Sequence, residues 1–397
     1  MLKEKFEIIL SSFNHRKTLA KLRKNYKKRA LNVIFLVTEN QKWAYQTLYE
    51  EFEKNKNYSP KVIIVPKKNL YNHKEIQKSI EENYNFFRER KIKVEICYDI
   101  TKNKYKNLKH HSPDIVFFEQ PFVLPNKLKP YSVSKYALPL FCPYSVSPTP
   151  KILARGARFY NALFKFFTPN KQLENEYIKT NEFKKGLFLY TGHPKLENIN
   201  ITNKPLENKT IIYAPHFSLL NTDLKLSTFN WSGNFILDFA KSHREFIWVF
   251  KPHPNFKKHF IESGYKSKKE MDEYFIEWKN VGTIYDKGDY FELFHNSNAL
   301  ITDCSSFLIE YFLYNKPVFH LVSNNATNKN SFTEAISSTY YKIFSKEALE
   351  SYLHEVLIKK NDFLKPLRKK YIQKFFNKKN QSSKKIISFL DRILKKW

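Results

Sequence analysis

The stretch Leu300-Ile301-Thr302-Asp303-Cys304-Ser305-Ser306-Phe307-Leu308-Ile309-Glu310-Tyr311 indicates the fold of this chain more directly than any other segment. Its apolar start predicts a buried strand, and the short polar residues after it predict an immediate turn into a helix. The N–H groups at the start of such a helix, together with the hydroxyls of Ser305 and Ser306, attract an anion. We therefore expect a phosphate-bearing substrate here. The alternative is an ordinary helix cap, made by Asp303 or Ser305, that binds nothing.

Alternating strands and helices extend from this stretch in both directions. Apolar runs predict strands at 33–37, 61–65, 93–97 and 114–118 in the first half, and at 210–213, 246–250, 299–302 and 317–321 in the second. Amphipathic segments at 41–54 and 75–90, and helical stretches in the second half, separate them. This order predicts an α/β protein with two parallel sheets, each covered by helices on both faces.

The composition narrows the class of protein. With 397 residues, 42% of them hydrophobic, the chain is long and apolar enough for two ordered domains. It contains only 7 Gly, and neither the dinucleotide-binding nor the P-loop glycine pattern is present. Three widely spaced cysteines, Cys97, Cys142 and Cys304, support neither a disulfide framework nor a zinc site. A reducing compartment fits this pattern, and we predict a cytoplasmic protein.

The net charge of +31 favours anionic partners such as nucleotides, polyanions or acidic lipid surfaces. Residues 11–29 and 359–397 are typical of basic helices that lie on the anionic inner face of the cell membrane, and a solvated helix face is the alternative for each. The sequence contains no run of about 18 apolar residues, so we predict no membrane-spanning helix. A basic protein that binds nucleic acid or membrane without catalysis is one rival hypothesis, but no nucleic-acid-binding module is recognisable, so we expect no nucleic acid partner.

Polar clusters follow three strands of the second half. They are Ala214-Pro215-His216-Phe217-Ser218 after 210–213, Lys251-Pro252-His253-Pro254 after 246–250, and Asp303-Cys304-Ser305-Ser306 after 299–302. Ligands of open α/β sheets bind beyond the carboxyl ends of the strands, so we expect these clusters to share one crevice. Two imidazoles, an ammonium group and two hydroxyls suit a pyrophosphate, because they can neutralise its charge and protonate a leaving group.

Four motifs in this order resemble the CDP-glycerol glycerophosphotransferase family, which makes teichoic-acid-like poly(alditol phosphate) chains. They are Thr191-Gly192-His193-Pro194-Lys195-Leu196-Glu197, Ile212-Tyr213-Ala214-Pro215, Lys251-Pro252-His253-Pro254, and Leu300 to Ser306 followed by Lys316-Pro317-Val318-Phe319. The resemblance implies a GT-B fold, with two Rossmann-like parallel-sheet domains facing a central cleft. We expect an acceptor-side domain over 1–200, a domain binding the nucleotide donor over 201–370, and a basic C-terminal helix over 371–397 that packs on the first domain or on the membrane.

The resemblance also implies roles for individual residues. His253 is expected to contact the donor pyrophosphate and to be catalytic, while Ser305 and Ser306 bind phosphate at the helix start. Asp303 is expected to organise the same loop. The remaining donor-binding residues implied by the matched motifs are Lys251, His193 and Pro215.

The group that removes the acceptor's proton is where the chain departs from the family. The family uses a His in a His-Gly-Thr-Pro motif of its first domain, and this chain has Phe118-Glu119-Gln120-Pro121-Phe122 at the equivalent place. Gln120 cannot take up a proton, whereas Glu119 and His216 both can. We favour His216 as the base, and it stands where better-known members have Thr.

These expectations combine into a reaction. An acceptor hydroxyl attacks the β-phosphorus of a CDP-alditol, and CMP departs from a pyrophosphate held by His253, Lys251 and the two serines. The acceptor is a polysaccharide or a lipid-linked capsule precursor, and the enzyme is peripheral on the inner face of the cell membrane. We predict no metal and no cofactor, since no Asp/Glu cluster typical of a metal site is visible. The nearest alternative is a GT-B glycosyltransferase that uses a nucleotide sugar for capsule or lipooligosaccharide synthesis.

The segment from Gln120 to Pro150 interrupts the regular alternation. Its prolines break regular elements, because proline lacks a backbone N–H and fixes φ. We therefore expect a long loop that carries part of the acceptor-side surface. An irregular crossover packed by its aromatic side chains is the alternative.

Overall fold

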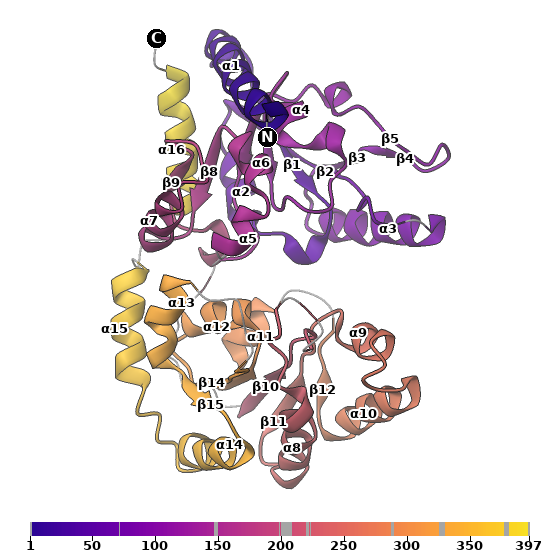
Figure 1. Cartoon of the computed structure of the whole chain (residues 1–397), viewed down its shortest axis with the longest axis vertical. Helices are drawn as coiled ribbons and strands as arrows, with labels where there is room; N and C mark the ends of the chain where they lie inside the picture. Colours follow the sequence, from indigo (N-terminus) through magenta and orange to yellow (C-terminus); the bar gives the residue numbers. More distant parts are fainter. Residues whose placement is uncertain are drawn as a thin grey trace. The chain divides into compact units, whose positions relative to one another are not determined.

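Two compact units make up the chain, as seen in a computed structural model (Figure 1). The first comprises Met1–Asn198 and Lys379–Trp397, and the second Ile199–Lys378. The structure describes residues 2–70, 72–146, 150–197, 199, 209–219, 222, 224–286, 290–324, 330–376 and 381–395. Each unit is an α/β layer structure built on its own parallel sheet.

The first unit contains a seven-stranded parallel sheet in the order β3-β2-β1-β6-β7-β8-β9. Its strands are β1 (Leu31–Val37), β2 (Tyr58–Ile64), β3 (Val94–Ile96), β6 (Ile115–Phe118), β7 (Leu138–Phe141), β8 (Lys165–Thr168) and β9 (Phe188–Tyr190), and the separate pair β4 (Tyr98–Asp99) and β5 (Lys104–Tyr105) forms an antiparallel hairpin. The helices are α1 (Leu2–Asn25), α2 (Gln46–Glu53), α3 (His73–Glu89), α4 (Pro130–Val133), α5 (Pro150–Ala154), α6 (Ala157–Asn161), α7 (Lys171–Lys179) and α16 (Ser382–Lys395), with 3-10 turns η1 (Asn40–Lys42), η2 (Leu108–His111), η3 (Asn126–Leu128) and η4 (Pro194–Leu196). Aromatic rings fill its core: Phe35 of β1 stacks on Phe117 of β6 at 5.1 Å between centroids.

The expectation of one long loop from Gln120 to Pro150 is wrong, because β7 lies inside this segment and inside the sheet. Pro139 is part of this strand between β6 and β8. The absence of an N–H on Pro139 removes no hydrogen bond between β7 and β8, because the pairing of these two strands begins only at Leu140 and Lys165. The carbonyl of Pro139 still accepts a hydrogen bond from the N–H of Phe164 at 2.8 Å. Proline at the beginning of a ladder is therefore compatible with a central strand here.

The second unit contains a six-stranded parallel sheet in the order β12-β11-β10-β13-β14-β15. Its strands are β10 (Thr210–Ala214), β11 (Ile247–Phe250), β12 (Thr283–Ile284), β13 (Ala299–Thr302), β14 (Val318–Leu321) and β15 (Tyr341–Ile343). Its helices are α8 (Phe229–Ser242), α9 (Phe256–Glu262), α10 (Lys268–Val281), α11 (Phe291–Asn296), α12 (Ser305–Phe312), α13 (Ser331–Ile336), α14 (Lys346–Leu353) and α15 (Lys365–Phe375), with the 3-10 turn η5 (Ser337–Thr339) and the π-helical turn η6 (His354–Ile358). The strands predicted at 210–213, 246–250, 299–302 and 317–321 are all present.

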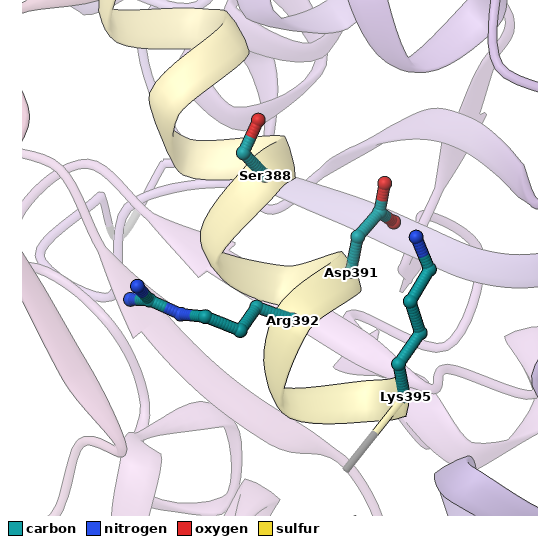
Figure 2. Close-up of a pocket in the computed structure, with 4 residues that line it drawn as sticks. All are labelled: Ser388, Asp391, Arg392 and Lys395. Carbon is teal, nitrogen blue, oxygen red and sulfur yellow. The ribbon is translucent and has the colours of Figure 1, made fainter.

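The basic C-terminal region forms two helices, of which α15 belongs to the second unit and α16 to the first. The buried face of α16 includes Ile386, Leu390 and Leu394, and it joins the core of the first unit. The hydroxyls of Tyr26 and Tyr58 donate to Asp391 Oδ1 at 2.8 and 2.6 Å. Figure 2 shows this carboxylate with Ser388, Arg392 and Lys395, which line an open pocket of ≈ 420 Å³ on the helix. Helix α16 thus packs on the first unit, whereas residues 371–375 of the segment expected as one helix over 371–397 belong to α15 of the second unit.

Candidate active site

Both sheets have the strand order of a doubly wound fold, which reverses direction at one point. In the second unit the reversal lies between β10 and β13, where the connections that follow the two strands leave toward opposite sides of the sheet and ligands of such sheets bind. Strand β10 pairs with β11 through Tyr213 and Phe250, and with β13 through Ala214 and Thr302. The three polar clusters predicted from the sequence therefore follow three adjacent strands at one edge of the sheet.

Asp303 ties these connections together. Its Oδ1 accepts a hydrogen bond from the backbone N–H of His216 at 2.6 Å, and its Oδ2 accepts from the N–H and hydroxyl of Thr228 at 2.8 and 3.0 Å. The side chain is buried, and burial raises the pKa of its carboxyl to about 6, although the hydrogen bonds from Thr228 and His216 lower it. Asp303 thus fixes both ends of the β10–α8 connection to the start of the β13–α12 connection.

The imidazoles of His216 and His253 contact each other edge to face, with 4.9 Å between ring centroids. The Phe217 ring packs against both, at 4.6 and 4.5 Å. The N–H of Asn255 donates to Nδ1 of His253 at 3.1 Å, and the N–H of Ser218 donates to Nδ1 of His216 at 3.1 Å. These hydrogen bonds assign the proton of each neutral ring to Nε2. Both histidines can therefore present an Nε2–H donor, the group that binds a phosphate oxygen.

This arrangement favours a donor role for His216 over the predicted role as a base. Burial lowers the pKa of His216 well below its ordinary value, and the nearby His253 and His259 lower it further. The neutral ring already uses Nδ1 as an acceptor toward Ser218, so its remaining nitrogen carries a proton. A base must instead offer an unprotonated nitrogen to the acceptor hydroxyl.

Ser305 and Ser306 are the first two residues of α12, and both are partly exposed. The residue before them, Cys304, is the N-cap and makes no side-chain capping hydrogen bond. The alternative of a simple cap made by Asp303 is therefore not what the structure shows, because that carboxylate bonds to the β10–α8 connection. A helix start that presents two hydroxyls and the positive end of the helix dipole remains suited to an anion.

Lys251 lies at the end of β11, and its side chain is directed into an aromatic cluster. Its Nζ lies over the rings of Tyr285, Tyr290 and Phe307 at 5.1 to 5.5 Å from their centroids, and the residue is buried. Such cation–π contacts stabilise an ammonium group away from bulk water. The positive charge predicted for this strand end is therefore present. The three aromatic rings that contact it were not predicted from the sequence.

His193 and Pro215 are hydrogen-bonded to neighbouring backbone groups. Pro215 follows β10 and accepts a hydrogen bond from the N–H of His253 at 3.1 Å, so it positions that residue. His193 lies in the first unit with no exposed surface. Its Nε2 bonds to the carbonyl of Pro143 at 2.6 Å, and its Nδ1 accepts from the N–H of Lys195 at 3.2 Å. Both ring nitrogens therefore hold the turn before η4 in place, and this geometry favours a structural role over the predicted donor contact.

Three residues around the site were given no role of their own from the sequence. Thr228 and Phe217 contact the site through Asp303 and the two histidines, and Ser218 sets the tautomer of His216. Phe217 and Ser218 directly follow His216, so their position after a strand was a usable signal. Thr228 lies 75 residues from Asp303 in sequence, and only the fold brings them together.

The strand orders, the two parallel-sheet units and the polar strand ends define an α/β enzyme of the GT-B type. Residues 165–388 match the family described as CDP-glycerol:poly(glycerophosphate) glycerophosphotransferase. This match covers more than half of the 397 residues, so the chain belongs to that family and is a transferase. The family resemblance seen in the sequence is thereby confirmed.

Solved structures show the same fold. A variant of the wall teichoic acid polymerase TagF has a TM-score of 0.55 and 13% identity, over 100% of this chain and 99% of that chain. A UDP-GlcNAc 2-epimerase from Methanocaldococcus jannaschii has a TM-score of 0.58 and 16% identity, over 91% and 99%. The epimerase from Neisseria meningitidis has a TM-score of 0.57 and 15% identity, over 91% and 100%. These likenesses concern the fold and confirm the GT-B prediction. A comparison with curated proteins gave no match.

Proposed function

We propose that the protein transfers an alditol phosphate, such as glycerol phosphate, from a CDP-activated donor to a hydroxyl of a cell-surface polymer or capsule precursor, and releases CMP. The observation that supports this most is the paired imidazoles of His216 and His253 at the switch point of the second sheet. In a chain of this family, two Nε2–H donors beside a helix start suit the two phosphates of a CDP-alditol. The acceptor polymer is teichoic-acid-like in this proposal.

The reaction moves a phosphoryl group and requires charge stabilisation more than covalent catalysis. The acceptor oxygen forms a bond to the β-phosphorus, and the bond from that phosphorus to the CMP oxygen breaks with its electron pair on CMP. In the proposal, His253 and His216 donate to the pyrophosphate, and the start of α12 binds a phosphate through Ser305 and Ser306. Lys251 supplies positive charge, and Asp303 positions the loops that carry these groups.

A donor screen tests the proposal. The full-length protein is incubated with CDP-glycerol, CDP-ribitol, UDP-GlcNAc or a CMP-activated sugar, together with an oligo(glycerol phosphate) acceptor that has a free terminal hydroxyl. CMP release from a CDP-alditol, with growth of the acceptor by one unit, supports the proposal. Release of UDP or CMP from a sugar donor alone contradicts it and supports a nucleotide-sugar glycosyltransferase. A CDP-alditol that binds the folded protein should also raise its melting temperature.

We further propose that helix α1 holds the enzyme on an anionic membrane surface. One face of α1 is buried through Ser11, His15, Thr18 and Leu22. On other positions, Phe6, Ile9 and Phe13 are 65, 69 and 52% exposed. Exposed basic side chains follow further along the helix at Arg16, Lys17, Lys21 and Lys24. Apolar side chains next to basic ones suit an acidic lipid surface.

Among the described helices, none is both long and apolar enough to cross a membrane.

Sedimentation with lipid vesicles tests this location. We expect binding to vesicles that contain phosphatidylglycerol and little binding to phosphatidylcholine vesicles, with the difference disappearing at high salt. The double change Phe6→Ser and Phe13→Ser should reduce binding, whereas exposed Phe363→Ser in the second unit is the matched control. Equal binding by all three proteins would remove α1 from the proposal.

A further inference from the structure

Two lysines of the first unit lie close together where strands β8 and β9 begin. Lys165 is the first residue of β8, and Lys184 lies in the segment that leads into β9. Their ammonium groups bridge the two segments crosswise, since Lys165 Nζ donates to the carbonyl of Gly186 and Lys184 Nζ donates to the carbonyl of Leu163. Both side chains are partly buried. An ammonium group has three donors, so donors remain on each lysine for a ligand.

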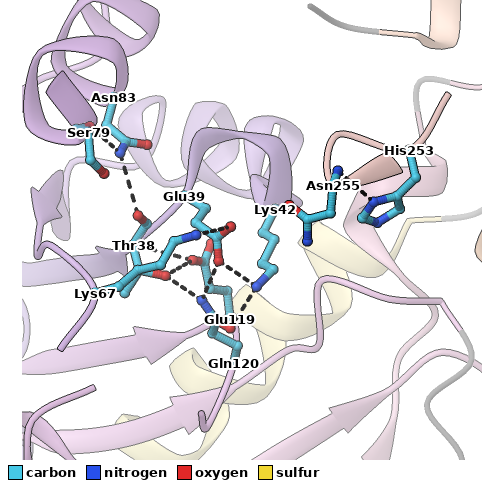
Figure 3. A network of polar contacts seen from close by, with 10 residues as sticks. All are labelled: Thr38, Glu39, Lys42, Lys67, Ser79, Asn83, Glu119, Gln120, His253 and Asn255. Atoms are coloured by element: carbon cyan, nitrogen blue, oxygen red, sulfur yellow. Dashed lines mark hydrogen bonds and ion pairs between the residues drawn. The ribbon is translucent and has the colours of Figure 1, made fainter. Parts of the chain in front are cut away.

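Neither ammonium group has a carboxylate partner in the part of the chain that the structure describes. Other partly buried lysines of the first unit are paired. Lys42 Nζ bonds to Glu39 Oε1 at 2.5 Å, and Lys67 Nζ lies 2.7 Å from Glu39 Oε2 (Figure 3). Charges taken out of water are normally paired, because an unpaired charge costs free energy. The two lysines at β8 and β9 therefore have a use for an anion that the protein itself does not supply.

The charges of the two lysines also act on each other. Burial, and after it the charge of Lys165, lowers the pKa of Lys184 to about 8. Burial lowers the pKa of Lys165 as well, against a raising effect of Glu174. Glu174 itself contacts Thr168 and Lys171. The doubly protonated pair is thus destabilised in the free protein, and an anion beside both groups would stabilise it.

Neutral groups complete the surroundings of the lysine pair. His15 of α1 is buried, and its Nε2 bonds to the carbonyl of Ala162 at 3.1 Å. Burial, and then the charge of Lys184, lowers the pKa of His15 to about 3, so this ring is neutral. Lys165 Nζ lies over the ring of Phe389 of α16 at 5.9 Å from its centroid. The lysine pair therefore lies where α1 and α16 meet the sheet, and these neighbours add no negative charge.

We propose that Lys165 and Lys184 form an anion site that binds a phosphate group. Phosphate oxygens accept charge-assisted hydrogen bonds from ammonium groups, and lysine binds phosphate as a compact point charge. The site lies at the amino ends of the strands, whereas substrates of such sheets bind at the carboxyl ends, so it is separate from the proposed reaction. His15 belongs to α1, the helix proposed to lie on an anionic membrane. The phosphate can therefore come from a lipid head group as well as from solution.

Amine labelling of the wild-type protein tests the site without any variant. A neutral amine reacts with acetic anhydride and an ammonium group does not, so bound phosphate should protect Lys184 by raising its pKa and by covering it. The probe is inorganic phosphate at about 50 mM, compared with sodium chloride of equal ionic strength. At about pH 8 we expect the labelling rate of Lys184, measured by peptide mass spectrometry, to fall about threefold or more. The neighbouring exposed Lys185 should change little.

A second probe identifies the source of the phosphate. Dihexanoyl phosphatidylglycerol, kept monomeric below its critical micelle concentration in chloride buffer, replaces the inorganic phosphate. Protection of Lys184 by the lipid supports a site that lipid head groups occupy, and protection by inorganic phosphate alone supports a site for free phosphate. Absence of protection by either probe overturns the proposal. The assay contains no CDP-alditol, so this result leaves the proposed function untouched.

Variants of the partner lysine show whether the two residues act as a pair. The quantity compared is the ratio of Lys184 labelling rates in chloride and in phosphate. Lys165→Gln should bring this ratio close to one, whereas Lys165→Arg should retain it, because the guanidinium keeps the charge and the donors. Lys185→Gln removes one charge beside the pair and is the matched control, with a ratio equal to that of the wild type. A ratio in Lys165→Gln that equals the wild-type value overturns the two-lysine assignment.

Discussion

The carboxylate of Asp303 accepts a hydrogen bond from the backbone N–H of His216 at 2.6 Å. This bond joins the β10–α8 connection to the β13–α12 connection of the second unit. One connection carries the histidine, and the other begins the helix with Ser305 and Ser306. Since the same carboxylate also accepts hydrogen bonds from the N–H and hydroxyl of Thr228, three hydrogen bonds hold the loop conformation around the proposed donor site. Donor binding and local stability should therefore depend on one side chain.

Asp303→Asn should both destabilise the second unit and weaken donor binding. The NH2 group that replaces one carboxylate oxygen cannot accept a hydrogen bond, so at least one buried donor of Thr228 or His216 loses its partner. We expect the free energy of unfolding to fall by about 2 kcal/mol, and the melting-temperature increase with CDP-glycerol to shrink. Urea denaturation measures the first effect. Asp238→Asn, at an exposed position of α8, is the control, and equal stability of the two variants would contradict this role for Asp303.

His253→Ala should remove turnover without unfolding the protein. The ring is partly exposed and its loss leaves no large cavity, so the melting temperature should change little. Losing one donor to the developing charge should lower CMP release by about 100- to 1,000-fold. His243→Ala tests a histidine of the same unit whose ring pairs with Glu245. Near-normal CMP release by His253→Ala, measured with CDP-glycerol and the acceptor, would remove this residue from the catalytic site.

The buried ring of His193 should make the protein sensitive to acid. Burial lowers the pKa of His193 to about 3, although the hydrogen bond to Pro143 raises it. The unfolded chain takes up a proton near pH 6.5 and the folded one does not, so stability is full above pH 6.5 and is lost as pH falls toward 3. The contribution of one histidine is at most about 1.4 kcal/mol per pH unit over that window.

Comparison of His193→Asn with the wild type isolates this contribution. The variant should be less stable at pH 8, because a buried ring and its hydrogen bonds are lost, and its stability should fall less steeply between pH 6.5 and 4. Urea denaturation across this range gives both quantities. Its affinity for CDP-glycerol should equal that of the wild type if the residue is structural. A loss of donor affinity at pH 8, with the protein folded, would restore the predicted contact with the donor.

Apolar runs in the sequence predicted those strands whose formation depends mainly on neighbouring residues. Four of the six strands of the second sheet, β10, β11, β13 and β14, were predictable because each apolar run ends in polar residues, and their parallel order followed from the alternation with helices. The short strands β12 and β15 were not predicted. Strand β7 was missed because a proline in a central strand depends on which neighbour its nitrogen faces, and this is set by register with β8. Short runs such as β8 and β9 carry too few residues to be distinguished from buried helix segments.

In the candidate site, too, features set by neighbouring residues were predictable and features set by the folded structure were not. The residues at the strand ends were predictable, since position after a strand was the signal for His216, His253 and Asp303. The tautomers were not, because they depend on the loop N–H groups of Ser218 and Asn255. The structural contacts of the motif from Thr191 to Glu197 were not predictable for a related reason. Its similarity to the family motif was visible, but its contacts with distant parts of the chain were not.

Glu197 at the end of that motif should hold the C-terminal helix. Its Oε1 accepts from the hydroxyl of Ser382 and the N–H of Ser383, both at 2.8 Å, and its Oε2 accepts from the Ser383 hydroxyl at 2.5 Å. A carboxylate at the start of α16 also meets the positive end of the helix dipole. Glu197→Ala should therefore cost about 2 kcal/mol and speed amide hydrogen exchange along 382–395.

A double-mutant cycle with Ser383→Ala separates this contact from a general loss of stability. If the two residues act through each other, the double variant should be more stable than the sum of the single effects predicts, by about 0.5 to 3 kcal/mol. Glu89→Ala, at an exposed position near the end of α3, controls for the loss of a carboxylate in the same unit. Additive effects with unchanged exchange in α16 would show that the apolar face of Ile386, Leu390 and Leu394 holds the helix without help from Glu197.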